Sequence, residues 1–189
     1  MALRRGFKAE ANSIARAMRS ELGLPFSGAL NPWKLAEHLA IPIITLSDMK
    51  DLAPKAVHHF SKTDSSEFSA VTVFEGTRRI IVHNDSHTLG RQASDIAHEL
   101  SHGILLHSPG PALNELGCRN WNEDMEDEAD WLSGALLISE EAALSIARQE
   151  MSIEEAADFY GVSKKMINWR LRMTGAYTRV TRTRRVYSK

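Results

Sequence analysis

The fold is organised around one stretch, Ile96-Ala97-His98-Glu99-Leu100-Ser101-His102-Gly103-Ile104-Leu105. His98 and His102 are four residues apart, so on an α-helix they share one face and can aim two imidazoles at one point. Imidazole nitrogen is a good ligand for Zn²⁺, at about 2.0–2.1 Å. Glu99 lies beside the pair, where its carboxylate can serve as general base toward water activated by a metal. The stretch therefore predicts a helical metal site with a catalytic glutamate.

The flanks of this stretch indicate a helix that packs in a core. Apolar residues recur at three- and four-residue spacing and form one stripe, made of Ala93, Ile96, Ala97, Leu100 and Ile104. Ser86 or Thr88 could cap the start of the helix, and residues 108–111, Ser-Pro-Gly-Pro, would stop it. The alternative is a chance match on an amphipathic helix, with both histidines merely hydrogen-bonded.

A tetrahedral catalytic site needs a third protein ligand and leaves one position for water. One known form of the motif, H-E-x-x-H-x-x-G-x-x-H, takes its third ligand from a later histidine. This chain has Leu105 in place of that glycine and Ser108 in place of that histidine, while His107 is one residue out of register. The longer form is therefore excluded, and a carboxylate from a following helix is the alternative.

Residues 126–137 supply that carboxylate. Glu128, Leu132 and Ala135 fall at i, i+4 and i+7, so Glu128 shares the apolar face of its predicted helix. A carboxylate aimed inward is costly unless it is paired or binds a metal, so the pattern favours Glu128 over Glu126 as third ligand. The other acids of this segment are expected to be solvated charges, namely Glu126, Asp127 and Asp130.

The two motifs together resemble those of the ImmA/IrrE family of metallopeptidases. The family pairs a helical A-H-E-[LI]-x-H with a later E-x-E-A-x-x-[FL]-[AS]-x-x-L-L. Here these are residues 97–102 and 126–137, and Ser139 replaces the proline that usually follows the second motif. The resemblance covers most of the chain, from a helical N-terminus to a final segment that ends near Gly175.

This resemblance implies a zincin-like fold in which His98, His102 and Glu128 bind zinc and Glu99 is the catalytic base. It also implies a regulatory endopeptidase whose usual substrate is a helix-turn-helix repressor of the XRE type. The expected fold is therefore α+β, with a mostly helical metallopeptidase core and a small sheet.

Composition limits the class of protein further. The chain has 189 residues, of which 43% are apolar and 25% charged, as in ordinary soluble globular proteins. Its one cysteine, Cys118, excludes an intrachain disulfide framework and indicates a reducing compartment. No apolar run approaches 18 residues, and none follows the N-terminal charges, so we expect no membrane span and no signal peptide. The expected location is cytoplasmic.

Periodicity places the remaining elements. We expect helices from about Phe7 to Leu22 and after Asn31-Pro32. Strands are expected at residues 41–46 and 57–60, followed by a hairpin of residues 68–74 and 79–83. This hairpin leads into the His98 helix, so it either is purely structural or offers a strand edge to an extended peptide.

Charge is distributed unevenly along the chain. Residues 1–150 carry 14 basic and 21 acidic side chains, whereas residues 151–189 carry nine basic and three acidic ones. Such asymmetry indicates an acidic partner, a nucleic acid, or docking onto the acidic part of the same molecule. We therefore expect a metallopeptidase domain at 1–150 and a separate segment at 151–189.

This last segment has helix-turn-helix spacing, with a glycine, Gly161, in the predicted turn. Ser152 and Glu155 form a capping box, and Ser163 can cap the second helix. If residues 161–189 contact DNA, Lys164, Lys165 and Asn168 would lie near a groove and the tail arginines on phosphates. The alternative is a helical packing unit that never touches DNA. The tail after Gly175 is expected to lack fixed structure without a partner.

Three functions therefore compete. The first is a zinc endopeptidase, and the second is a DNA-binding regulator whose metal site is structural or sensory. The third is a partner-binding regulator that cleaves nothing. Glu99 favours the first, because a sensing site needs ligands but no base. The residue that stabilises the oxyanion is not identifiable from sequence, with His83, His87 and Tyr160 as candidates.

Overall fold

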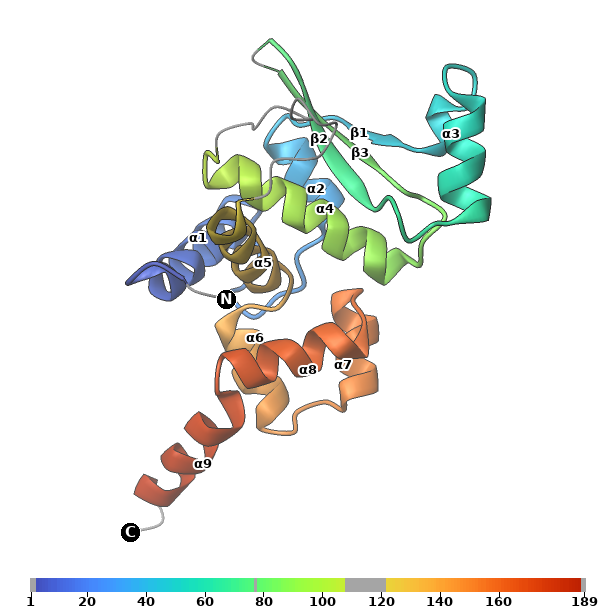
Figure 1. The fold of residues 1–189 in the computed structure, drawn as a ribbon. Helices are drawn as coiled ribbons and strands as arrows, with labels where there is room; N and C mark the ends of the chain where they lie inside the picture. The colour runs from blue at the N-terminus through green and yellow to red at the C-terminus, as the bar shows by residue number, and fades with distance from the viewer. Residues whose placement is uncertain (1–2, 77, 108–121, 188–189) are drawn as a thin grey trace.

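The computed structural model describes residues 3–76, 78–107 and 122–187, and it confirms the expected α+β, mostly helical fold (Figure 1). Cys118 lies outside these residues. The elements are, in order, α1 (Phe7–Glu21), α2 (Pro32–His38), β1 (Ile43–Thr45), the 3₁₀-helix η1 (Ser47–Met49), α3 (Pro54–His58), the π-helix η2 (His59–Thr63), β2 (Ala70–Glu75), β3 (Arg78–His83), α4 (Leu89–Ile104), α5 (Glu123–Leu137), α6 (Glu140–Ala147), α7 (Ile153–Tyr160), α8 (Lys164–Met173) and α9 (Ala176–Tyr187).

Capping residues begin several of these helices where the sequence predicts. The Asn31 side chain accepts hydrogen bonds from the backbone of Trp33 and Lys34 at the start of α2. The predicted capping box of Ser152 and Glu155 is present in α7, and Ser163 caps α8. These side chains satisfy backbone N–H groups that have no partner within the helix.

The three strands form one mixed sheet in the order β1-β3-β2. β2 and β3 are the predicted hairpin and pair antiparallel, with Val71 opposite Val82. β1 pairs with β3 in parallel, with Ile43 opposite Ile81. Both β1 and β2 are therefore edge strands of this sheet.

The strand predicted at residues 57–60 is wrong, because these residues belong to α3 and η2. Pro54 occupies the first turn of α3, where its missing N–H costs no hydrogen bond. Ser61 then donates its hydroxyl to the Val57 carbonyl one turn earlier, at 2.6 Å. The four residues of the predicted strand are too few to outweigh these local helical bonds.

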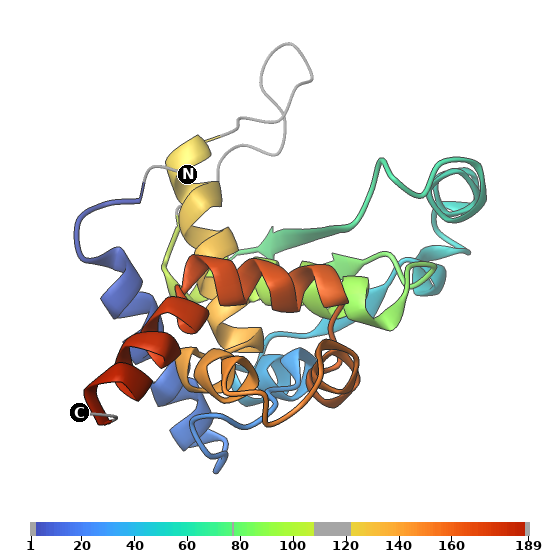
Figure 2. The ribbon, with the colours of Figure 1, turned by 90° about the horizontal axis from the view of Figure 1, so that it is seen from below.

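The prediction for the tail is also wrong, because residues after Gly175 form α9, which projects away from the core in both views (Figures 1 and 2). Ala176 and Val180 of this helix are buried in a cluster that includes residues of α6. Arg179 makes an ion pair with Glu140 at the start of α6. Some of the C-terminal positive charge is thus neutralised within the molecule.

α4 is the central helix, with the sheet on one side and the C-terminal helices on the other (Figure 1). Its Ile96 and Leu100 pack with apolar residues of α1, α2 and α5. Its Ala93 and Ala97 belong to a second cluster that continues through α6, α7, α8 and α9. The apolar core therefore runs across position 150. Within the described ranges, no helix is both long and apolar enough to cross a membrane.

Two fully buried arginines hold the C-terminal end of α5. Arg19 of α1 donates to the carbonyls of Leu136 and Gly28, at 2.7 and 3.0 Å. Arg170 of α8 donates through Nε to the carbonyl of Ile138, at 3.0 Å. Cations are favourable at a helix C-terminus, where the last carbonyls lack intrahelical partners. The two arginines thereby fix α5 against both α1 and α8.

Gly134 allows α8 to approach α5 closely. A Cβ atom at this position would lie 2.3 Å from Trp169 Cζ3 and 2.9 Å from Arg170 Cδ. Real carbon atoms cannot approach that closely, so any larger residue would push α8 away from α5.

We predict that Gly134→Ala lowers the free energy of unfolding by about 1–3 kcal/mol, as overpacking in a dense interior usually does. Gly103→Ala is the matched control, because its Cβ would meet only the flexible end of Arg79, at 2.7 Å from Nη1. That variant should be neutral or gain up to about 1 kcal/mol from helix propensity. Denaturant unfolding of both proteins tests this; equal stability of the two variants would contradict it.

Candidate metal centre

The candidate site lies where α4 crosses α5. Residues Ile96, Leu100 and Ser101 of α4 are buried and fix the roll of the helix. This roll turns His98 and His102 toward α5, as their four-residue spacing predicts. Their rings lie 4.8 Å apart between centroids.

Three side chains converge at this point, namely His98, His102 and Glu126. The two imidazole Nε2 atoms are 3.0 Å apart. Glu126 Oε2 lies 3.1 Å from the Nε2 atom of His98 and 3.6 Å from that of His102. The three atoms all lie within 4.8 Å of one another, and within the described part of the chain this is the group that could hold a metal ion.

These distances fit a tetrahedral ion. Bonds of about 2.0–2.2 Å at tetrahedral angles place neighbouring ligand atoms about 3.3 Å apart. The observed separations of 3.0, 3.1 and 3.6 Å bracket that spacing. Two imidazoles and one carboxylate are also ligand types that zinc accepts, and three protein ligands leave the fourth position open. The side chains therefore suit a catalytic rather than a closed structural site.

Asp130 holds the outer nitrogen of His98, because His98 Nδ1 donates to Asp130 Oδ1 at 2.9 Å. Burial lowers the pKa of His98, but hydrogen bonds to Asp130 and Glu126 outweigh it and raise the pKa to about 10. Burial likewise raises the pKa of Glu126, but its hydrogen bonds to His102 and His98 hold it well below its usual range. A cation bound between these groups would replace the proton that the raised pKa assigns to His98.

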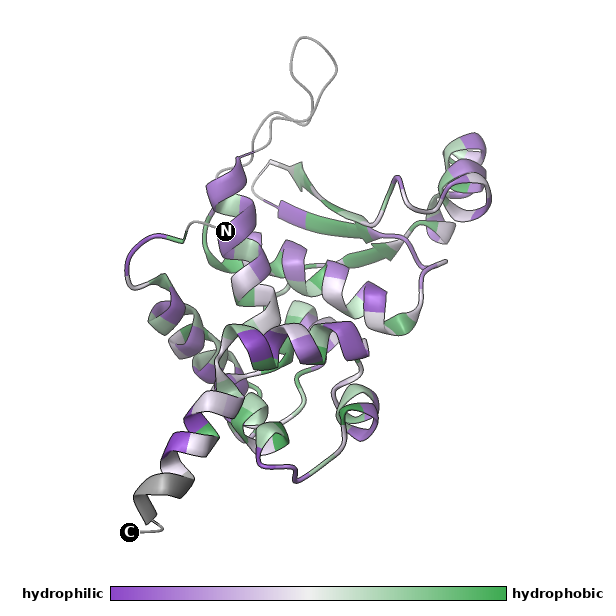
Figure 3. Cartoon of the chain, turned by 60° about the horizontal axis from the view of Figure 1, so that its bottom comes forward, coloured by the Kyte–Doolittle hydropathy of each residue, from purple (hydrophilic) through white to green (hydrophobic). Residues whose placement is uncertain are grey.

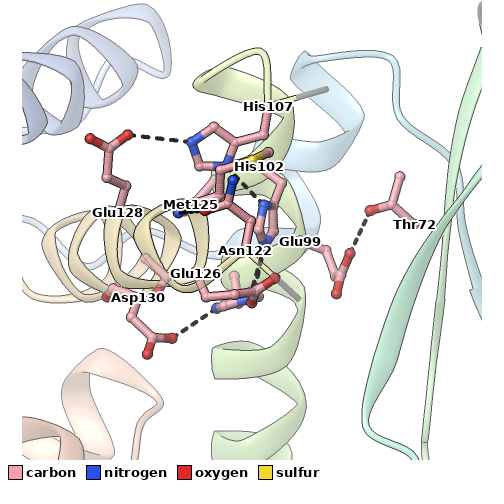
Figure 4. A network of polar contacts seen from close by, with 12 residues as sticks. Thr72, Glu99, His102, His107, Asn122, Met125, Glu126, Glu128 and Asp130 are labelled. Atoms are coloured by element: carbon pink, nitrogen blue, oxygen red, sulfur yellow. Dashed lines mark hydrogen bonds and ion pairs between the residues drawn. The ribbon is translucent and has the colours of Figure 1, made fainter. Parts of the chain in front are cut away.

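Glu99 points from α4 toward the sheet and is only 6% exposed. Thr72 of the edge strand β2 donates its hydroxyl to Glu99 Oε2 at 2.6 Å (Figure 4). One carboxylate oxygen of the expected general base is therefore held by a strand of the predicted hairpin, through a contact that no sequence pattern indicates.

Glu128, the expected third ligand, is not brought to the histidine pair. Its carboxylate lies 2.8 Å from Arg4 Nε. It also lies 3.4 Å from His107 Nε2 (Figure 4). The apolar-face argument fails because Trp131 to Leu137 are all buried. Because this part of α5 is buried on all sides, its apolar residues do not show which side of the first turns faces inward.

The expectation of a solvated charge is wrong for Glu126, whereas Asp130 is exposed as expected but also contacts His98. They are four residues apart on α5 and both turn toward His98. Glu126 is 16% exposed and Asp130, at the rim, is 57% exposed. Their i, i+4 spacing was visible in the sequence and could have suggested a shared partner.

His107 is a further residue near the site whose position sequence reasoning missed. Its Nδ1 lies 2.9 Å from His102 Nδ1. Leu106, with φ of 55°, turns the chain back after α4 so that His107 faces the helix. The spacing of His102 and His107 does not fit one face of a continuous helix, which is why the pattern gave no signal.

The three candidates for stabilising an oxyanion are engaged elsewhere. Tyr160 donates its hydroxyl to the Ser27 carbonyl at 2.9 Å. His87 Nε2 lies 2.7 Å from the Ser65 carbonyl. His83 is buried and its ring packs edge-on against Trp33. These contacts lie outside the group formed by His98, His102 and Glu126.

Comparison with known families identifies the chain. The model of the IrrE N-terminal-like domain, Peptidase M78, matches residues 36–172. The chain belongs to this family. No curated protein and no solved structure gave a significant match.

The matched region of this IrrE N-terminal-like protein runs from within α2 to within α8, and so includes both motifs and the helix-turn-helix spacing. The family is one of peptidases, which supports a metallopeptidase-type function and a protein substrate.

Proposed function

We propose that this protein is a zinc-dependent endopeptidase of regulatory type that cleaves a helix-turn-helix repressor of the XRE type and so derepresses genes. One observation carries the catalytic part of the proposal. The ligand atoms of His98, His102 and Glu126 lie within 4.8 Å of one another, and Glu99 is next in the chain to His98. The repressor as substrate rests on the family resemblance.

His98, His102 and Glu126 would hold the zinc ion in this proposal. A bound zinc ion supplies Lewis-acid polarisation of the scissile carbonyl and lowers the pKa of water. Glu99 takes the proton of the attacking water on its carboxylate and passes it to the leaving amine nitrogen. Thr72 holds Glu99 Oε2, so we assign the proton transfer to the other carboxylate oxygen.

The edge strand β2 is the proposed docking site for the substrate backbone. β2 lies at the edge of the sheet, and its Thr72 contacts Glu99 directly. An extended peptide that adds a strand beside β2 would form main-chain hydrogen bonds with it. Its scissile bond would then lie close to the general base, which is the orientation that peptide hydrolysis requires.

We predict about one bound Zn²⁺ per chain. Glu126→Ala should lose most of it, because two histidines alone make an incomplete site. Glu123→Ala is the matched control, since it removes an exposed acid from the first turn of the same helix. Metal analysis after dialysis tests this. Full zinc content in Glu126→Ala together with loss in Glu128→Ala would return the third ligand to Glu128.

We predict that Glu99→Gln folds and binds zinc but cleaves about 10²–10⁴-fold more slowly, because glutamine cannot accept the proton. The test incubates the zinc-loaded protein with the product of an adjacent helix-turn-helix gene, and mass spectrometry then follows discrete fragments. Asp124→Asn, an exposed change in α5, is the control. Reporter output in cells completes the test, because normal derepression by zinc-replete Glu99→Gln would favour a regulator that only binds.

A second candidate function, DNA contact through residues 161–189, is supported by the surface of α8. Its exposed residues, Lys164, Lys165, Asn168 and Arg172, are all basic or polar and share one face. Hydrophilic residues also cover much of α9 (Figure 3). The opposite face of α8 is buried against the core through Ile167, Arg170 and Leu171.

If this face contacts DNA, affinity should fall steeply with salt as counterions are released from phosphates. Replacing Lys165 and Arg172 by glutamine should then reduce the slope of log affinity against log salt by about 2, at about 0.9 for each phosphate contact. The same two-charge loss at Lys55 and Lys62, exposed on α3 and η2, is the control. Mobility shifts at rising salt measure both, and the absence of any shift at low salt would exclude DNA contact.

A further inference from the structure

His98 and His102 are oriented alike, with Nε2 toward Glu126 and Nδ1 away from it. Each directs Nε2 inward to Glu126, and each has a polar partner for Nδ1 on the outer side. For His98 this partner is the carboxylate of Asp130. For His102 it is another imidazole, that of His107, with the two Nδ1 atoms 2.9 Å apart.

The proton positions along the hydrogen-bonded series His102, His107 and Glu128 depend on one another. His102 can offer the lone pair of Nε2 to a metal ion only if its own proton is on Nδ1. That Nδ1–H must then donate to His107 Nδ1, so His107 must carry its proton on Nε2. His107 Nε2 lies 3.4 Å from Glu128 Oε2, and a carboxylate can only accept. Glu128 therefore favours the tautomer of His107 that His102 requires.

Glu128 is itself held away from the ligand atoms. Arg4 Nε lies 2.8 Å from Glu128 Oε1, and the same guanidinium binds both carboxylate oxygens of Glu10 in α1 at 2.7 Å. Arg4 is about half exposed, so this ion pair adds little stability by itself. Its effect is geometric, because it turns the Glu128 carboxylate toward the N-terminal segment.

The backbone conformation of Leu106 places His107 against His102. A leucine with φ of 55° is uncommon, because its Cβ is crowded in the left-handed region. The turn also brings the amide of His107 within 3.0 Å of the His102 carbonyl. Such local strain persists where the surrounding contacts hold it, and here it places one imidazole against another.

We infer that His107 and Glu128 form a positioning pair that sets the tautomer and ring orientation of His102, with Arg4 keeping Glu128 out of the ligand set. This inference rests on the proposed function, since it assumes that His102 binds the metal. Outer partners of metal-bound histidines fix the ring and raise its basicity, and their loss typically costs about 10–100-fold in metal affinity.

The test is a double-mutant cycle on zinc affinity, measured by competition with a chelator. His107→Ala and Glu128→Ala should each weaken binding by about 10–100-fold while one Zn²⁺ per chain is still bound at saturation. The double variant should lose little more zinc affinity than either single variant, because Glu128 acts on His102 only through His107. His107→Gln, which retains an acceptor and a donor, should recover part of the loss, and Glu123→Ala serves as control.

The outcomes separate this inference from the proposed function. Loss of stoichiometric binding in Glu128→Ala with normal affinity in His107→Ala would overturn it, because Glu128 would then be a direct ligand. Wild-type affinity in both single variants, or fully additive losses, would also overturn it and leave the proposed function standing. A wild-type protein that binds no zinc would overturn both.

Discussion

The crossing of α4 and α5 is the constraint on which the rest of the site depends. Three polar atoms of His98, His102 and Glu126 meet there, 3.0 to 3.6 Å from one another. Removing these groups from water costs free energy that their mutual contacts must offset. They stay together because buried apolar residues on the other faces of both helices fix the helix positions.

The C-terminal helices help to fix the position of α5 at this crossing. Arg170 of α8 and Arg19 of α1 reach the last carbonyls of α5, and Gly134 lets Trp169 lie against that helix. A buried arginine is costly unless its charge meets polar partners, and the free carbonyls at the helix end provide them for Arg19. Arg170 uses only Nε for this purpose, and its guanidinium otherwise lies over the rings of Trp131 and Trp169. The segment after residue 150 therefore supports the helix that carries Glu126, while its exposed basic face stays available for a partner.

The site is also surrounded by an outer layer of contacts from distant parts of the chain. Thr72 comes from the sheet, Asp130 from α5 and Arg4 from the segment before α1. Thr72 holds Glu99, Asp130 holds His98 itself, and Arg4 holds Glu128. In metal sites such outer contacts decide ligand orientation and affinity as much as ligand identity does. The fold thus positions the candidate ligands through elements that are far apart in sequence.

The sequence by itself determined the family, the mostly helical α+β class, the helix that carries His98, Glu99 and His102, the hairpin, and the caps of α2, α7 and α8. All of these depend on spacing or capping within a few residues, which a local pattern records. Only the tertiary structure decided which carboxylate meets the histidines, because that depends on the rotation of α5 about its axis. Glu126 and Glu128 are two residues apart and therefore lie on nearly opposite sides of a helix. The contacts of Arg19, Arg170 and Gly134 fix that rotation, and they join segments more than 30 residues apart.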